Sequence, residues 1–180
     1  MMFLLRMLMR KGGARSMDPL QVSMTGVRMG ERFLQIGCYD KALLSGLAAK
    51  VGLSGTAAVA AFDQQQVKLA QQVGARIGAL IDTKVIDAGT LPFESGEYDM
   101  VVIDDTNGAF SAIEAAARLQ YLRDAKRTVR QGGRIEIVEG TKTGAASSDP
   151  VEDLSSAGFK PVRVLAERDG FRFVEGLKTS

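Results

Sequence analysis

Three carboxylates stand at the ends of apolar stretches that are typical of strands. Asp104 and Asp105 follow residues 98–103, and Glu139 ends the stretch that begins at Arg134. Because the carboxyl ends of parallel strands meet at one edge of a sheet, these side chains are candidates for acid–base chemistry in one crevice. Adjacent strand residues point to opposite faces, so Asp104 and Asp105 are not expected to act as a pair. We favour a plainer interpretation, in which one carboxylate caps the turn at 106–108 and the other is solvated, so that no catalytic residue is assigned.

The chain has no histidine and a single cysteine, Cys38. This composition removes triads and metal sites that depend on histidine, and no metal is expected. One thiol cannot form an internal disulfide, which favours a reduced, cytoplasmic setting.

Basic residues gather near the N-terminus, where residues 1–17 carry four of them and no acid. The rest of the chain then holds 19 basic and 21 acidic side chains. A weakly acidic body without a basic, aromatic-rich stripe is a poor surface for phosphates, so no nucleic-acid partner is expected.

Residues 1–16 form a basic, Met-rich segment ahead of a domain that spans 17–180. The apolar run of this segment is too short to cross a bilayer, and no basic region precedes it as in a signal peptide. If residues 1–11 form a helix, Arg6 and Arg10 share one face, and another face carries Phe3, Leu4, Met7 and Leu8. Three alternatives stay open: an amphipathic anchor for a membrane surface or a partner protein, a disordered extension, and Met17 as the true start. The oligomeric state is not predicted.

Strand-like and helix-like stretches alternate from Gly30 onward. The expected strands are 33–36, 57–62, 84–86, 98–103, 134–139, 161–167 and 170–176. The expected helices are 41–50, a helix capped by Asp63 that Gly74 closes after Val73, 111–130 and 151–157. This alternation predicts an α/β, Rossmann-like, doubly wound sheet of seven strands, mostly parallel, with an antiparallel C-terminal hairpin.

Four stretches of the sequence carry a resemblance to a known family. They are residues 29–38, residues 87–94 with Tyr98-Asp99, residues 122–134, and residues 157–159 with 171–176. In this order they resemble the first strand and loop, the third motif and next strand, the helix and turn written RxLKPGGR, and the closing hairpin of the class I S-adenosylmethionine-dependent methyltransferases. The resemblance is greatest to the ubiquinone/menaquinone-biosynthesis C-methyltransferases. The resemblance runs from about residue 27 to 178.

This resemblance implies that S-adenosylmethionine is the cofactor and where it would be held. The methionine end would meet the loop 35–41, where the family has glycines at the positions of Gly37, Tyr39 and Lys41 and an acid at that of Gln35. The ribose would meet a family acid at the position of Ala61, and we favour a helix-capping role for Asp63 over a ribose contact. The adenine would meet Asp87 and the backbone of Ala88, and a role for Asp87 that only orders the loop after a strand is an equally open alternative. The predicted cofactor-binding residues are Gly37, Tyr39, Ala61, Phe62, Asp87, Ala88 and Asp104.

Departures from the family pattern fall on several contacts with one ligand, at Gln35, Tyr39, Lys41 and Ala61. The sequence therefore favours a methyltransferase fold with a degenerate cofactor site, acting as a non-catalytic subunit or partner-binding protein. This protein would be cytoplasmic, with peripheral membrane association through residues 1–11 as one possibility. The alternative is an active S-adenosylmethionine-dependent methyltransferase that acts on a small or lipid-like, quinone-type acceptor.

Overall fold

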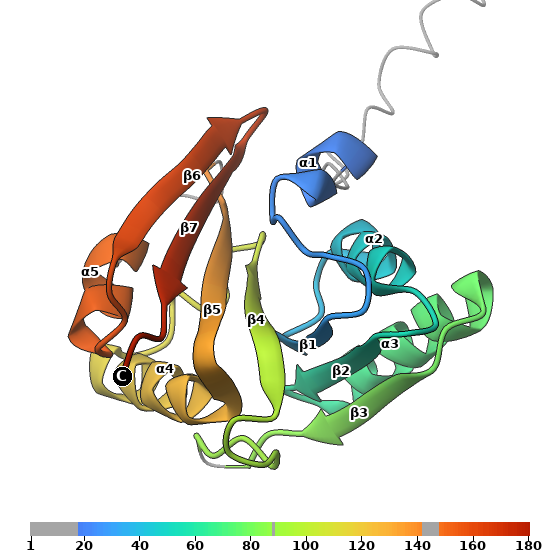
Figure 1. Cartoon of the computed structure of the whole chain (residues 1–180), viewed down its shortest axis with the longest axis horizontal. Coiled ribbons are helices and arrows are strands. Elements are labelled where there is room, and N and C mark those ends of the chain that lie inside the picture. Colours follow the sequence, from blue (N-terminus) through green and yellow to red (C-terminus); the bar gives the residue numbers. More distant parts are fainter. Residues whose placement is uncertain (1–17, 88, 142–147) are drawn as a thin grey trace, which may run out of the picture.

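The computed structural model describes residues 18–87, 89–141 and 148–180 (Figure 1). The basic segment 1–16, the alternative start at Met17 and the predicted adenine contact Ala88 lie outside the described residues. No helix within the described part of the chain is long and apolar enough to cross a membrane.

Seven strands form one sheet in the order β3-β2-β1-β4-β5-β7-β6 (Figure 1). They are β1 (Arg32–Ile36), β2 (Thr56–Ala61), β3 (Ile81–Val85), β4 (Tyr98–Asp105), β5 (Val129–Gly140), β6 (Val162–Arg168) and β7 (Phe171–Leu177). The first five strands run parallel, and β7 pairs antiparallel with both β5 and β6. The predicted fold class is therefore confirmed.

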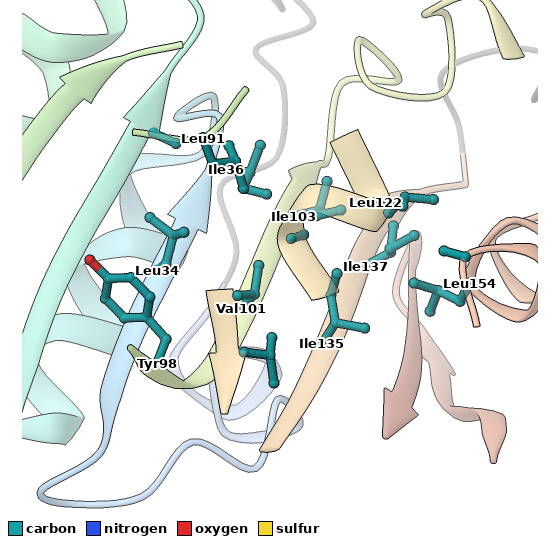
Figure 2. Packing of buried hydrophobic residues seen from close by; sticks show 14 of the residues in the cluster. Leu34, Ile36, Leu91, Tyr98, Val101, Ile103, Leu122, Ile135, Ile137 and Leu154 are labelled. Atoms are coloured by element: carbon teal, nitrogen blue, oxygen red, sulfur yellow. The ribbon is translucent and has the colours of Figure 1, made fainter. Parts of the chain in front are cut away.

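Helices cover both faces of the sheet. They are α1 (Pro19–Ser23), α2 (Lys41–Val51), α3 (Gln64–Ile77), α4 (Ala115–Thr128) and α5 (Pro150–Ser156). Alternate residues of β1 enter different cores, because successive strand side chains point to opposite faces. Phe33 packs with residues of α2 and α3. Leu34 belongs to the cluster on the other face, which also contains Leu122 of α4 and Leu154 of α5 and is drawn in Figure 2.

Several predicted boundaries are wrong. Gly74 does not end its helix, because α3 continues to Ile77 and is capped by Gly78, whose φ is 69°. A Cβ on Gly74 would lie 2.8 Å from the Ala79 carbonyl oxygen, so this glycine permits a close approach and does not stop the helix. Strand β3 begins at Ile81 and not at residue 84, since it is a mostly exposed edge strand without an apolar run. Helix α4 begins at Ala115 and not at residue 111, and residues 129 and 130 already belong to β5.

Candidate functional site

The candidate site lies at the carboxyl ends of β1, β2, β3 and β4. The chain adds strands outward from β1 in one direction through β2 and β3, and in the other through β4 and β5. Open α/β sheets bind ligands at such a switch point, because the loops diverge there and leave a crevice. The predicted cofactor residues on β1, β2 and β4 come together at this edge, as the register pairs Ile36 with both Ala60 and Ile103.

In the loop between β1 and α2, the backbone N–H groups of residues 37–40 donate to acceptors within the protein. Those of Tyr39 and Asp40 donate to one oxygen of Asp104, at 2.7 and 2.8 Å. The Gly37 N–H donates to the Ala60 carbonyl at 2.9 Å. The Cys38 N–H donates to the Gln66 side chain at 3.1 Å. A ligand at this loop would therefore have to bind through other groups.

Helix α2 begins directly after this loop with its first N–H groups already capped. The Asp40 carboxylate accepts from the N–H groups of Ala42 and Leu43, at 2.8 and 3.2 Å. Lys41 is exposed. Burial raises the pKa of the Cys38 thiol to about 12, and the nearby Asp104 carboxylate adds to the rise. The thiol is thus unreactive near neutral pH.

The Tyr39 ring lies over Gly37. The φ of Gly37 is 78°, and a Cβ built on it would be 3.1 Å from Tyr39 Cε2 and 3.5 Å from Phe62 Cε2. Tyr39 therefore fills the space above the glycine that a ligand at this loop would use. Burial raises the pKa of its phenol, so the ring is neutral at physiological pH.

Gln35 carries a buried acceptor at the same place. Its side chain is fully buried, and its Nε2 donates to the Gly37 carbonyl at 3.0 Å. Its Oε1 has no hydrogen-bond partner among the described residues. A buried, unpaired oxygen costs about 1–3 kcal/mol, so this atom is suited to accept a hydrogen bond from a bound cation or amide.

The carboxylates at the end of β4 are both buried, so the expectation that one is solvated is wrong. Asp104 accepts from the backbone and the hydroxyl of Thr106, at 3.2 and 2.6 Å, in addition to the two loop N–H groups. Asp105 accepts from the N–H groups of Phe110 and Ser111, at 2.8 and 3.1 Å. Burial raises the pKa of both groups, and these hydrogen bonds oppose the rise. Asp104, predicted as a cofactor contact, holds the loop that a cofactor would approach.

Glu139 lies beside Asp105, because the two residues are register partners on β5 and β4. Burial raises the pKa of Glu139, and Arg172 at 3.7 Å opposes that rise. Sequence reasoning placed Glu139 in the same crevice as Asp105 but did not identify the two residues as cross-strand neighbours.

The predicted ribose position is apolar. Ala61 is fully buried and offers only a methyl group. Asp63 accepts from the Gln66 N–H at 2.9 Å and caps α3. Phe62 meets Tyr121 of α4 edge to face, with ring centroids 5.7 Å apart. Sequence reasoning missed both Tyr121 and Gln66, whose side-chain oxygen accepts from Cys38 and Phe62 and so joins the loops after β1 and β2.

The predicted adenine position is exposed, and hydrogen bonds hold the backbone of the loop in which it lies. Asp87 is exposed, and its carbonyl accepts from the Thr90 N–H at 3.0 Å. Arg127 donates to the carbonyls of Leu91 and Phe93, at 3.0 and 2.8 Å, and so fixes the loop against α4. The loop backbone is thus held while the Asp87 side chain faces solvent.

A family model for the ubiE/COQ5 methyltransferase family matches residues 15–173. The chain belongs to this family. It is similar to the ubiquinone/menaquinone biosynthesis C-methyltransferase UbiE of Ectopseudomonas mendocina, with 25% identity over 158 residues that cover 85% of this chain. The chain spans about 60% of the length of that relative.

Solved structures share the fold of this family member. An S-adenosylmethionine-dependent methyltransferase from Aquifex aeolicus matches with a TM-score of 0.71 and 20% identity, covering 89% of each chain. A structure described as PigF with SAH matches with a TM-score of 0.58 and 19% identity, covering 82% of this chain and 50% of that one. In this member of the ubiE/COQ5 family, Tyr39 takes the space above Gly37 in the loop after β1.

Proposed function

We propose that the chain is an S-adenosylmethionine-dependent methyltransferase that acts on a small or lipid-like acceptor. The observation that carries this proposal is the unpaired, buried Oε1 of Gln35 beside Gly37, in the first loop of a ubiE/COQ5 family member. An ammonium group is the partner that such an oxygen lacks. The quinone type of acceptor comes from the relatives' name alone.

Four side chains would hold the cofactor in this proposal. Gln35 would accept a hydrogen bond from its amino group, and Asp87 one from its adenine amino group. Phe62, which follows β2, and Tyr121, which lies midway along α4, meet edge to face and would form an apolar wall for the flat base. S-adenosylmethionine, when bound, supplies the methyl group on its sulfonium, and the residues of the chain orient it. Methyl transfer depends mainly on proximity and alignment, so the absence of an assigned base does not count against the proposal.

Tyr39 sets the cofactor affinity. Its ring must leave the space above Gly37 before a ligand can reach Gln35. Moving a half-buried aromatic ring into water costs on the order of 1–2 kcal/mol, which weakens binding roughly tenfold. The wild-type chain should thus bind the cofactor weakly.

The position of the Tyr39 ring also favours a second function. Tyr39 over Gly37, the apolar Ala61 and the internally used N–H groups of the loop together describe a site adapted to remain without a ligand. On this alternative the family member is a non-catalytic subunit or partner-binding protein.

Calorimetry with S-adenosylmethionine and S-adenosylhomocysteine separates the two functions. We expect weak binding by the wild-type chain and about tenfold tighter binding by Tyr39→Ala. Leu20→Ala, at an exposed position on α1, is the matched control and should bind as the wild type does. If neither the wild type, Tyr39→Ala nor Tyr39→Ala with Ala61→Asp binds either compound, the methyltransferase proposal is wrong.

A further inference from the structure

An apolar groove lies at the edge of the sheet opposite the candidate site. It has a volume of about 580 Å³ and is formed by the ends of α2 and α3 and the starts of β2 and β3, on the right of Figure 1. Small residues such as Ala49 and Ala79 are among those that line it. The volume is in the range of clefts that hold a ligand or a short peptide.

Two leucines at this groove are almost completely exposed. Leu53 is 100% exposed and Leu80 is 94% exposed, and both line the groove. Fully exposed leucines beside an apolar cleft indicate a surface that another apolar group covers. Asp82 is the only charged residue among the described residues that line it, so a partner with basic side chains is favoured.

Helix α1, the first described element of the chain, lies close to this groove. Val22 of α1 packs on α2 at Gly46, where a Cβ would lie 2.6 Å from a Val22 methyl carbon. Ala49 is three residues further along α2, on the same helix face and about 4.5 Å along the axis. The groove therefore begins about one turn from the point where α1 sits.

The segment that precedes α1 carries apolar and basic side chains, which complement the apolar lining of the groove and the charge of Asp82. Spaced for a helix, Phe3, Leu4, Met7 and Leu8 share one face, and Arg6 and Arg10 lie together on another. Methionine side chains adapt to irregular apolar surfaces. The six residues from 12 to 17 can span up to about 20 Å, which is enough to reach one turn along α2.

We propose that this groove binds the apolar face of residues 3–8 of the same chain. Leu53 and Leu80 pack against that face, and Asp82 lies within reach of its arginines. The proposal concerns the edge of the sheet away from the cofactor site and does not depend on methyltransferase activity.

Disulfide trapping in the full-length chain tests this placement directly. The one native cysteine, Cys38, is buried, so it does not compete with the engineered cysteines for disulfide formation. Met7→Cys with Leu80→Cys should form an intramolecular disulfide on mild oxidation. The matched control, Met7→Cys with Val164→Cys, places the second thiol on β6 at the far edge of the sheet, and it should stay reduced. A disulfide found only in dimers, or equal oxidation of both pairs, would overturn the proposal.

Limited trypsin cleavage at Arg6 and Arg10 gives a second readout. We expect Leu53→Asp with Leu80→Asp to raise the cleavage rate at least about tenfold, because two apolar contacts are lost. Met29→Asp, at a residue that is 80% exposed outside the groove, is the control and should leave the rate unchanged. Equal rates in all three proteins contradict the proposal. So does protection that appears only when vesicles containing phosphatidylserine are added.

Discussion

The two ends of the candidate crevice differ in how their polar groups are used. At the β1 end, the loop N–H groups of Tyr39 and Asp40 are bound to Asp104, and a ring lies over Gly37. At the β3 end, the loop backbone is fixed by Arg127, while the Asp87 side chain is exposed. A ligand would therefore compete with the protein's own contacts at one end and with water alone at the other.

This difference lies in side chains and not in the path of the backbone. Among the described residues, Asp169 is the only non-glycine with a positive φ, so Tyr39 adopts an ordinary conformation. In this chain, a glycine at position 39 would thus add space above Gly37 and is not required by the backbone conformation. Tyr39→Ala should therefore restore binding nearly as well as Tyr39→Gly.

The largest effect is expected for the carboxylate that holds the β1 end. Asp104→Ala leaves the buried N–H group of Asp40 and the partly buried N–H groups of Tyr39 and Thr106 without their acceptor. We expect a loss of about 3–5 kcal/mol in the free energy of unfolding, measured by urea denaturation. Asp104→Asn, which keeps one acceptor oxygen, should lose less than Asp104→Ala. A loss below about 1 kcal/mol for Asp104→Ala would remove the contrast between the two ends.

A second buried acid, Glu136, extends the polar groups of the β1 end across the same face of the sheet. Its side chain is fully buried, and neither carboxylate oxygen has a partner among the described residues. It faces Glu175 across the β5–β7 pair. Burial raises its pKa well above the ordinary 4.5, and the Glu175 charge adds to the rise.

Because the pKa of Glu136 is raised in the folded state, its contribution to the free energy of unfolding decreases as pH rises. The fold holds the Glu136 proton more tightly than the unfolded chain does. The stability is therefore fully present below about pH 4.5 and is lost as pH rises toward the raised value. Glu136→Gln should stabilise the protein by about 1–3 kcal/mol at pH 8 and have little effect at pH 4.

Urea denaturation between pH 4 and pH 8 measures this dependence. Arg163→Gln is the control with the opposite sign, because it removes the ion pair with Glu175 at 2.9 Å, leaves that carboxylate beside the buried Glu136, and should destabilise the protein at pH 8. An unchanged pH profile in Glu136→Gln would mean that the carboxyl is ionised in the fold.

The sequence predicts most of the fold because local patterns decide it. Apolar runs such as residues 98–103 and the cap at Asp63 mark their own elements. The candidate site is less predictable, because its contacts join distant residues. Asp104 meets Tyr39 across 65 positions, and Arg127 reaches Leu91 across 36. No local pattern distinguishes a solvated aspartate from one that receives the N–H groups of another loop.

The third prediction concerns Asp63, which stands between the two ends of the crevice. As the N-cap of α3, it should contribute about 1 kcal/mol to the free energy of unfolding, and Asp63→Ala should lose that amount. Because the carboxylate serves the helix, S-adenosylhomocysteine affinity in the Tyr39→Ala background should not change. The reverse outcome, lost affinity at unchanged stability, would make Asp63 a ribose ligand.

The smallest change in stability is expected at the β3 end. Asp87 is exposed, so Asp87→Ala should alter the free energy of unfolding by less than about 0.5 kcal/mol. In the Tyr39→Ala background the same substitution should weaken S-adenosylhomocysteine binding by roughly tenfold, since an adenine hydrogen bond is lost. Glu94→Ala, in the same loop, is the control for a general change of charge and should bind as its parent does. If Asp87→Ala leaves both stability and affinity unchanged, the β3 end is only an exposed loop. Any binding by the chain would then depend on the β1 end alone, where the ring of Tyr39 and the oxygen of Gln35 act in opposite directions.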